Sequence, residues 1–187
     1  MESLNSTRVL FVCTANQCRS PLAEAIATRV ALSSPIEFSS GGLIRGGVAM
    51  PRIGVRVAAA KGLDLSMHLS RQIGASDLAE ADVILTMTRA QSREVVARDP
   101  DTWPRVFTVK QFARWLSGRE RPDQRLRRWL DFEAGDRPRS ELFGADRADD
   151  IIDPVNSSAR VWRQVAFELE DRIEMIVLTL TVNSSTR

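Results

Sequence analysis

The sequence predicts one α/β domain, residues 1–187, with a four-stranded parallel sheet, helices on both faces and an insertion before the last helix. Short apolar runs alternate along the chain with stretches of helical periodicity. This alternation is typical of a parallel sheet covered by helices. The runs are almost continuously apolar, as strands buried on both faces are. A chain of 187 residues is long enough for one such domain with its own core.

The first strand and the first helix are the clearest elements. Residues 8–12 form an apolar run that predicts a buried strand. Ser20 is the expected N-cap of the following helix, and Pro21 suits its first position. The apolar residues of that helix recur on one face, at Leu22, Ile26 and Val30.

The other elements follow in the same alternation. Further strands are predicted at 36–39, 83–87 and 106–109. One helix is expected over 52–61, with Ile53 and Val57 facing inward and Gly62 as the stop. A second, polar helix is expected after the 83–87 strand and extends to about Arg98. The longest helix is predicted from about Ser158 to Leu180. Its apolar residues stand at helical spacing, at Trp162, Val165, Leu169, Ile173, Ile176 and Leu180.

The stretch 111–149 has a different character. Two short amphipathic pieces, 112–116 and 126–132, are separated and followed by charged stretches that contain Pro and Gly. We interpret this stretch as an insertion rather than a second domain. Three aromatic side chains are expected to fold it onto the core: Trp115, Trp129 and Phe132. A partner surface or a flap over a functional site is the alternative.

Charge and hydropathy narrow the possible classes of function. The net charge is only +2, and basic residues are mixed with nearly as many acidic ones, which does not favour nucleic-acid binding. No apolar stretch approaches the roughly 20 residues that cross a bilayer, so no membrane contact is expected. The N-terminus lacks the pattern of a secretory signal. A cytoplasmic, reducing location is therefore expected, without a structural disulfide.

Both cysteines of the chain, Cys13 and Cys18, lie between the first strand and the first helix. A zinc site needs about four ligands, and two Cys with one His do not favour any metal. Two small buried thiols would be the ordinary structural interpretation. Against it, Cys13 stands at the carboxyl end of a buried strand, where α/β sheets bind their ligands.

The loop after Cys13 has the features of an anion site. It leads from Thr14 to Arg19 and into a helix N-terminus, where backbone N–H groups and the helix dipole favour negative charge. The same groups would stabilise a nucleophilic thiolate at Cys13. Arg19 could hold an oxyanion through two parallel hydrogen bonds, and Ser20 could donate to the sulfur. We therefore predict attack of a thiolate on phosphorus.

The string CTANQCRSP, residues 13–21, resembles the active-site signature of the low-molecular-weight protein tyrosine phosphatases, whose core is Cys, five residues, Arg and Ser. Three more stretches are similar to this family: 38–42 (FSSGG), 67–73 (MHLSRQI) and 82–91 (DVILTMTRAQ). The resemblance covers 8–110 and about 150–180, and it leaves the insertion out.

The resemblance implies a role for each of these residues. Cys13, Arg19 and Asp153 would be catalytic, with Asp153 first a general acid and then the base for the hydrolytic water. The phosphoryl group would contact the loop, residues Thr14, Ala15, Asn16, Gln17, Cys18 and Ser20. Ser40 and His68 would support that loop through a hydrogen-bond network around Asn16. No cofactor is implied. The implied partner is a phosphorylated protein, with a cognate tyrosine kinase as a further candidate, and the enzyme would be a monomer or weak dimer.

Two of these roles have alternatives in the residues themselves. Asp153 precedes Pro154, and Asp-Pro is also a common turn signal. Asp149 and Asp150 are nearby rivals for the acid role, but neither precedes a proline. Cys18 is expected near Cys13, where a transient disulfide would protect the nucleophile from irreversible oxidation.

The chain also departs from the family pattern. Ala15 and Gln17 stand where Gly and Ile are usual. After Asp153-Pro154 the chain continues with 155–157 (VNS) instead of aromatic residues, and it contains no tyrosine. Phosphoryl chemistry is left intact, but a Trp or Phe of the insertion would have to supply an aromatic wall for phosphotyrosine.

The leading prediction is a phosphatase that hydrolyses phosphotyrosine in proteins, and aryl phosphates, through a phosphocysteine. One alternative is arsenate reduction with an external low-molecular-weight thiol, because no cysteine follows Cys18 to form a relay. Another is a different phosphoresidue such as phosphoarginine, which Gln17 favours. The last is a phosphate-binding module without turnover, which the complete set of Cys13, Arg19 and Asp153 argues against.

Overall fold

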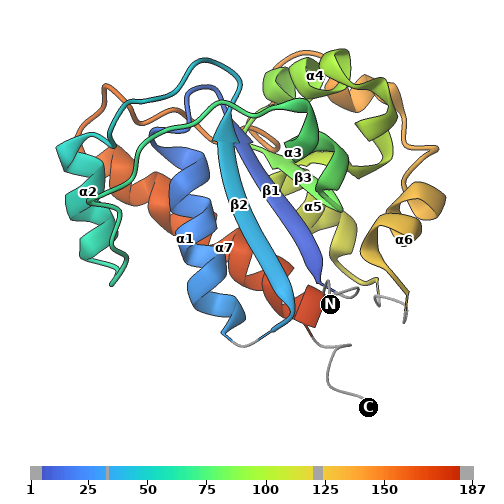
Figure 1. The fold of residues 1–187 in the computed structure, drawn as a ribbon, viewed down its shortest axis with the longest axis horizontal. Coiled ribbons are helices and arrows are strands. Elements are labelled where there is room, and N and C mark those ends of the chain that lie inside the picture. Colours follow the sequence, from blue (N-terminus) through green and yellow to red (C-terminus); the bar gives the residue numbers. More distant parts are fainter. Residues whose placement is uncertain (1–5, 33, 120–123, 182–187) are drawn as a thin grey trace.

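Four parallel strands form one sheet in the order β2-β1-β3-β4 (Figure 1). The computed structural model describes residues 6–32, 34–119 and 124–181. The strands are β1 Thr7–Cys13, β2 Ile36–Gly42, β3 Val83–Thr86 and β4 Val106–Thr108. After β1 the chain adds β2 on one side and then β3 on the other. The carboxyl end of β1 is therefore the point at which the strand order reverses, where open sheets bind ligands.

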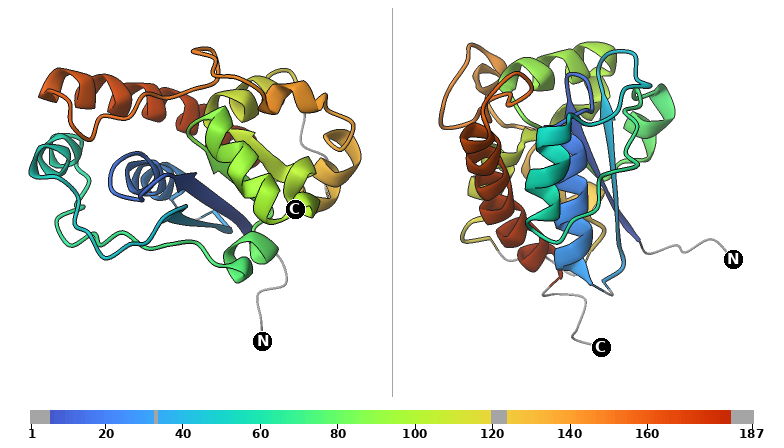
Figure 2. Two further views of the ribbon diagram at one scale, coloured as in Figure 1. Left: turned by 90° about the horizontal axis from the view of Figure 1, so that it is seen from above. Right: turned by 90° about the vertical axis from the view of Figure 1, so that its left-hand side faces the viewer.

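Helices cover both faces of the sheet (Figure 2). The α-helices are α1 Arg19–Ala31, α2 Arg52–Ala59, α3 Ala75–Glu80, α4 Arg89–Arg98, α5 Val109–Leu116, α6 Leu126–Glu133 and α7 Ala159–Thr181. Two 3₁₀ turns complete the set, η1 Pro100–Arg105 and η2 Arg139–Leu142. Helices α1, α5 and α7 share the larger core cluster, whereas α3 and α4 share the smaller one on the opposite face. The predicted fold class is confirmed.

Successive side chains of β1 alternate between the two core clusters. Val9 and Phe11 point into the larger cluster, and Leu10 and Val12 into the smaller one. Successive side chains of a strand point to opposite faces, so a strand buried on both sides must be apolar at each position. This arrangement fixes β1 at the centre of the molecule, and with it the position of Cys13 at its end.

The last helix is the main cover of the larger cluster. Its six predicted apolar residues are all 1% exposed or less: Trp162, Val165, Leu169, Ile173, Ile176 and Leu180. The helix lies beside α1, α2 and α5 (Figure 2). Gly54 of α2 makes this contact close, because a Cβ there would stand 2.5 Å from the Trp162 ring. None of the helices in the parts of the chain that the structure describes is long and apolar enough to cross a membrane.

Several predicted boundaries were wrong by a few residues. Strand β2 runs to Gly42 rather than 39, because the sequence Ser-Ser-Gly-Gly continues its pairing with β1. Strand β4 ends at Thr108, whose side chain caps α5, so that Val109 is already helical. Gly62 has a φ of +74°, as expected for a helix stop, although α2 ends at Ala59.

Ser20 is not the N-cap of α1. The helix begins at Arg19, Cys18 is the capping position, and no side chain there makes a capping hydrogen bond. The Ser20 hydroxyl instead lies beside the Cys13 sulfur and the Gly41 carbonyl. Local propensity predicts that Ser20 caps the helix, but its hydroxyl makes these tertiary contacts instead of a capping hydrogen bond.

Within the described residues, the stretch 111–149 packs on the main body. Its first helix, α5, buries Phe112 and Leu116 against α7 and the sheet. Trp115 contacts Trp129 with ring centroids 4.8 Å apart, which confirms their expected role in folding this stretch onto the core. The same expectation was wrong for Phe132, which is 81% exposed on α6. That this stretch is an insertion stays a prediction.

Candidate active site

The loop after β1 lies against the glycine-rich end of β2. The Leu43 N–H donates to the Thr14 carbonyl at 2.8 Å, and so does that of Ile44 at 3.0 Å. Gly42 allows this approach, because a Cβ there would stand 2.9 Å from the Ala15 carbonyl carbon. Gly42 is thus needed for the loop to lie this close to the end of the sheet, whereas a Cβ at Gly41 would meet Ile73.

A backbone N–H and a hydroxyl group meet at the sulfur of Cys13. The Asn16 backbone N–H points at Sγ from 3.2 Å, and the Ser20 hydroxyl lies 3.1 Å away. Cys13 is the last residue of β1 and is only 2% exposed, and its sulfur lies beside Ser20 in the first turn of α1. Donors of this kind stabilise a sulfur anion, as does the N-terminal end of a helix. These contacts are of the kind that the predicted anion-binding loop requires, and phosphoryl binding by this loop stays a prediction.

Asn16 holds the loop in an unusual backbone conformation. Its φ of +52° lies in the left-handed region, which Asn adopts more readily than most residues. The side-chain amide donates to Ser40 Oγ at 2.8 Å and to Ser20 Oγ at 2.9 Å. Its Oδ1 accepts from the Arg71 backbone N–H at 3.0 Å. His68 Nε2 lies 2.7 Å from the Asn16 carbonyl oxygen. The structure therefore brings Ser40 and His68 to Asn16.

Arg19 and Asp153 come together beside this loop. The Arg19 guanidinium is 4% exposed, donates from Nη1 to the Ile151 carbonyl at 3.0 Å and forms an ion pair with Asp153 through Nη2. Its Nε is buried and finds no hydrogen-bond partner among the described residues. Asp153 is 44% exposed, and its Oδ1 accepts from the Val155 N–H at 3.1 Å in a turn. Asp153 therefore forms the predicted turn and also reaches the site.

The remaining loop residues differ in exposure. Thr14 is exposed, and Ala15 and Gln17 are half-buried, whereas Cys18 is 4% exposed. Sequence reasoning missed Gln91, whose Nε2 donates to Thr14 Oγ1 at 3.0 Å. Its signal was present, since Gln91 ends the 82–91 stretch that resembles the family.

The expected aromatic wall is not supplied by either tryptophan of the 111–149 stretch. Trp115 and Trp129 contact each other within the larger core cluster. Phe132 faces outward from α6, and Phe143 is 66% exposed with its carbonyl bonded to Arg89. Val155, which follows the Asp-Pro pair, is 37% exposed.

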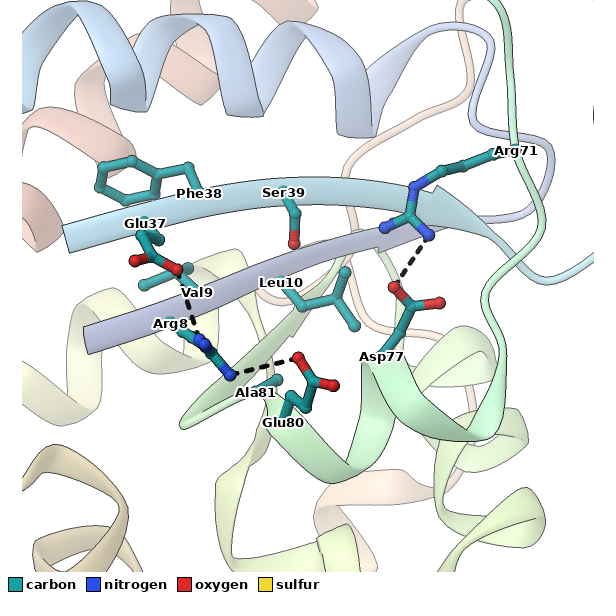
Figure 3. A pocket seen from close by; sticks show the side chains of 10 residues that line it. All are labelled: Arg8, Val9, Leu10, Glu37, Phe38, Ser39, Arg71, Asp77, Glu80 and Ala81. Carbon is teal, nitrogen blue, oxygen red and sulfur yellow. Dashed lines mark hydrogen bonds and ion pairs between the residues drawn. The ribbon is translucent and has the colours of Figure 1, made fainter. Parts of the chain in front are cut away.

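A separate pocket of about 280 Å³ lies beside β1, β2 and α3 (Figure 3). None of the predicted catalytic residues lines it. Both of its arginines are already paired with carboxylates, Arg8 with Glu37 and Glu80, and Arg71 with Asp77. With three carboxylates against two arginines, the lining is net negative and does not favour a phosphoryl group.

Comparison with known proteins decides the family. The family model of low molecular weight phosphotyrosine protein phosphatases matches residues 8–123, which include the loop from Cys13 to Arg19 and the four strands apart from Thr7. The chain belongs to this family. The resemblance of residues 13–21 and of the three further stretches to these phosphatases is thus confirmed.

Relatives of this phosphatase carry two different substrate names. A probable low molecular weight protein-tyrosine-phosphatase EpsP from Ralstonia solanacearum is 41% identical over 102 residues, which cover 54% of this chain and 69% of the relative. A protein-arginine-phosphatase from Geobacillus stearothermophilus is 27% identical over 170 residues, covering 90% of this chain and 93% of the relative.

The similar solved structures also include both an arginine phosphatase and a tyrosine phosphatase. The YwlE arginine phosphatase from Geobacillus stearothermophilus superposes with a TM-score of 0.72 at 27% identity, covering 95% of both chains. A low molecular weight protein tyrosine phosphatase from T. tengcongensis superposes with a TM-score of 0.70 at 29% identity, covering 92% of this chain and 99% of that one. Both superpositions extend well beyond the loop from Cys13 to Arg19.

Replacing Cys18 by serine is expected to make inactivation by peroxide harder to reverse. Peroxide converts the Cys13 thiolate to a sulfenic acid, and attack by Cys18 on that sulfur would release water and form a disulfide that thiols reduce. Burial, together with the Asp153 carboxylate and Cys13, raises the pKa of Cys18 to about 12. Closure of the disulfide should therefore speed up with rising pH.

The measurement is the activity recovered with dithiothreitol after a timed peroxide treatment at several pH values. Wild type should recover most of its activity, and Cys18→Ser should recover progressively less as exposure lengthens. Equal recovery of the two proteins at every exposure would rule out a protective role for Cys18.

Proposed function

We propose that this phosphatase hydrolyses phosphotyrosine in proteins through a covalent phosphocysteine. The observation that carries the proposal is the convergence of the Asn16 N–H and the Ser20 hydroxyl on the Cys13 sulfur, with Arg19 and Asp153 paired beside them. Nucleophile, anion-binding groups and proton donor thus stand together at the carboxyl end of β1.

In the first step the Cys13 thiolate attacks phosphorus. Backbone N–H groups of the loop and the Arg19 guanidinium, whose Nε has no partner among the described residues, bind the phosphoryl oxygens. A phosphoryl group that takes the Arg19 N–H groups displaces Asp153 from its ion pair. The freed Asp153 carboxylate takes up a proton from solvent, and the resulting carboxyl gives this proton to the leaving oxygen as the P–O bond breaks and the S–P bond forms.

In the second step water releases the phosphate. Asp153, now a carboxylate, accepts a proton from a water molecule that attacks phosphorus, and the S–P bond breaks. The Ser20 hydroxyl, 3.1 Å from Sγ, donates to the sulfur as it leaves with its electron pair. Cys13 returns to the thiolate, and one phosphate is released for each substrate.

Phosphoarginine is the second candidate substrate. The half-buried Gln17 adds a polar amide where an apolar residue is usual in the family. The residues after Asp153 are not aromatic, and no tryptophan of 111–149 replaces them. The alignment with a protein-arginine-phosphatase covers 90% of this chain, against 54% for the tyrosine phosphatase EpsP. These observations support a test in which both phosphoresidues compete directly.

The test is release of phosphate from matched peptides that carry phosphotyrosine, phosphoarginine, phosphoserine or phosphothreonine, in buffer with chelator. We expect hydrolysis of the phosphotyrosine peptide with the highest kcat/KM. A higher value for phosphoarginine would transfer the assignment to that residue. No hydrolysis of any peptide or aryl phosphate, together with thiol-dependent release of arsenite from arsenate, would replace it by arsenate reduction.

The proposed setting is the cytoplasm, with a phosphorylated protein as the partner and a tyrosine kinase as the source of the phosphate. Both cysteines are free thiols in the structure, as a reducing compartment keeps them. The enzyme is proposed to act as a monomer or weak dimer. Its molar mass in solution would check the last point.

A further inference from the structure

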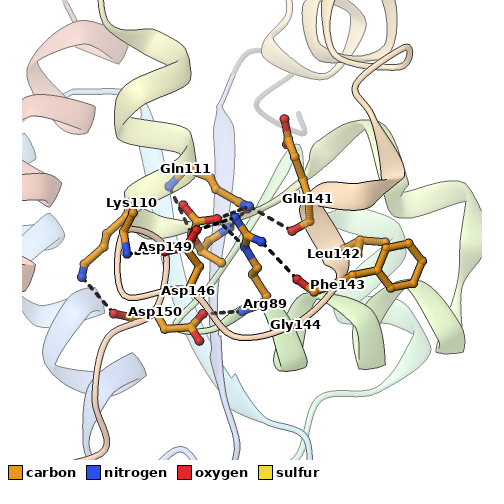
Figure 4. Close-up of polar contacts among 12 residues, drawn as sticks. Arg89, Lys110, Gln111, Glu141, Leu142, Phe143, Gly144, Asp146, Asp149 and Asp150 are labelled. Atoms are coloured by element: carbon orange, nitrogen blue, oxygen red, sulfur yellow. Dashed lines mark hydrogen bonds and ion pairs between the residues drawn. The ribbon is translucent and has the colours of Figure 1, made fainter.

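A buried carboxylate anchors the segment that carries Asp153. Asp149 is 1% exposed, and its oxygens accept from Arg89 Nε at 2.5 Å and from Gln111 Nε2 at 2.9 Å (Figure 4). They also accept from Arg114. Burial opposes the charge, but the hydrogen bonds from Arg114 and Arg89 outweigh it, and the pKa of Asp149 lies below its usual range. Asp149 therefore stays a carboxylate with partners on two different helices, α4 and α5.

Arg89, at the start of α4, contacts this segment with its backbone as well as with its side chain. Its backbone N–H donates to Asp150 Oδ1 at 2.8 Å, and Nη2 donates to Asp146 Oδ2 at 3.1 Å. Just before it, the Met87 carbonyl accepts from the Ile151 N–H at 2.8 Å. The end of β3 and the first residue of α4 thus hold residues 146–151 at several points. Residue 151 in turn accepts from Arg19 Nη1.

The chain between the end of β3 and the first turn of α4 also contacts the loop that follows Cys13. Gln91 accepts from the Met87 N–H at 2.9 Å and donates to Thr14 Oγ1 at 3.0 Å. Residues 87–91 therefore contact both the loop that starts at Cys13 and the segment that ends at Asp153. This short piece of chain sets the spacing between nucleophile and acid.

We propose that Arg89 and Asp149 are positioning residues for proton transfer by Asp153, and the proposal rests on the proposed function. Neither touches the phosphoryl group. Their contact fixes the main chain at 149–151, and through it the place of the Asp153 carboxyl relative to Cys13. Proton transfer needs hydrogen-bond distance between acid and leaving oxygen, so a shift of about 1 Å costs much of the benefit.

The experiment measures kcat/KM for aryl phosphates whose phenols differ in acidity. A good leaving group such as 2,4-dinitrophenolate needs little protonation, whereas phenolate depends on the acid. We expect Arg89→Lys and Asp149→Asn to lower the rate with phenyl phosphate by about tenfold or more, and with the dinitrophenyl ester by less than about threefold. The dependence of rate on leaving-group pKa should therefore steepen, which simple loss of folded protein cannot produce.

Arg93→Lys is the matched control. Arg93 stands one turn after Arg89 on α4 and bonds to the carbonyls of Leu142 and Gly144, close to the Phe143 carbonyl that Arg89 contacts. No hydrogen bond joins its side chain to Asp149 or Asp150. The same substitution at Arg93 should leave the leaving-group dependence at the wild-type value.

Two further comparisons keep the test decisive. Asp149→Asn leaves two arginines facing a neutral amide and is expected to lower thermal stability, so Arg89→Lys, which keeps the charge, serves as the second variant. In an Asp153→Asn background, Arg89→Lys should have no further effect on the slope, because the proton donor is already gone. The proposal would be overturned if kcat/KM depended on leaving-group pKa as in wild type for both single variants, while that dependence became steeper for Asp153→Asn. Absence of hydrolysis in wild type would instead overturn the proposed function.

Discussion

Cys13→Ser is expected to lower kcat for p-nitrophenyl phosphate by about 10⁴-fold or more, as removal of a covalent nucleophile commonly does. A serine hydroxyl remains protonated at neutral pH, whereas a thiol loses its proton far more readily. The two donors that converge on Sγ, the Asn16 N–H and the Ser20 hydroxyl, suit a sulfur anion and give a neutral hydroxyl little activation.

Binding of phosphate should survive this substitution. Arg19 and the loop N–H groups are unchanged in Cys13→Ser, so titration with inorganic phosphate should give a dissociation constant close to that of wild type. This measurement separates a lost nucleophile from a collapsed loop. Cys18→Ser makes the same chemical change in the same loop and should cost far less activity. Turnover in Cys13→Ser equal to that of wild type would contradict the covalent mechanism.

The features nearest Cys13 in the chain were the most predictable. An apolar run followed by Cys, five residues and Arg places a thiol and a guanidinium around one helix N-terminus, because a strand end and a helix start fix both. The long helix from Ala159 was equally clear, since its six apolar residues keep the helical spacing over its whole length.

More distant partners were beyond residue patterns alone. Ser40 and His68 stand 24 and 52 positions from Asn16, and only the resemblance to a family joined them to it. Arg89 and Asp149 are 60 positions apart, and nothing in the sequence joins them: Arg89 resembles an ordinary surface charge, and Asp149 stood out only as a rival of Asp153. Helix α3 was missed because six residues with one buried leucine carry almost no periodic signal.

Asp153→Asn is expected to lower kcat for phenyl phosphate by about 10²- to 10⁴-fold, the usual contribution of a general acid. The loss should shrink for 2,4-dinitrophenyl phosphate, whose leaving group needs no proton.

The ion pair between Arg19 and Asp153 predicts a separate effect on KM. A phosphoryl dianion must displace the carboxylate from the guanidinium before it binds, and an amide competes less strongly for that cation. KM should therefore stay level or fall in Asp153→Asn while kcat drops. Asp171→Asn, at an exposed position of α7, is the matched substitution and should change neither constant. An equal loss of kcat for both esters would remove Asp153 from the acid role and leave it with the turn before α7 as its only role.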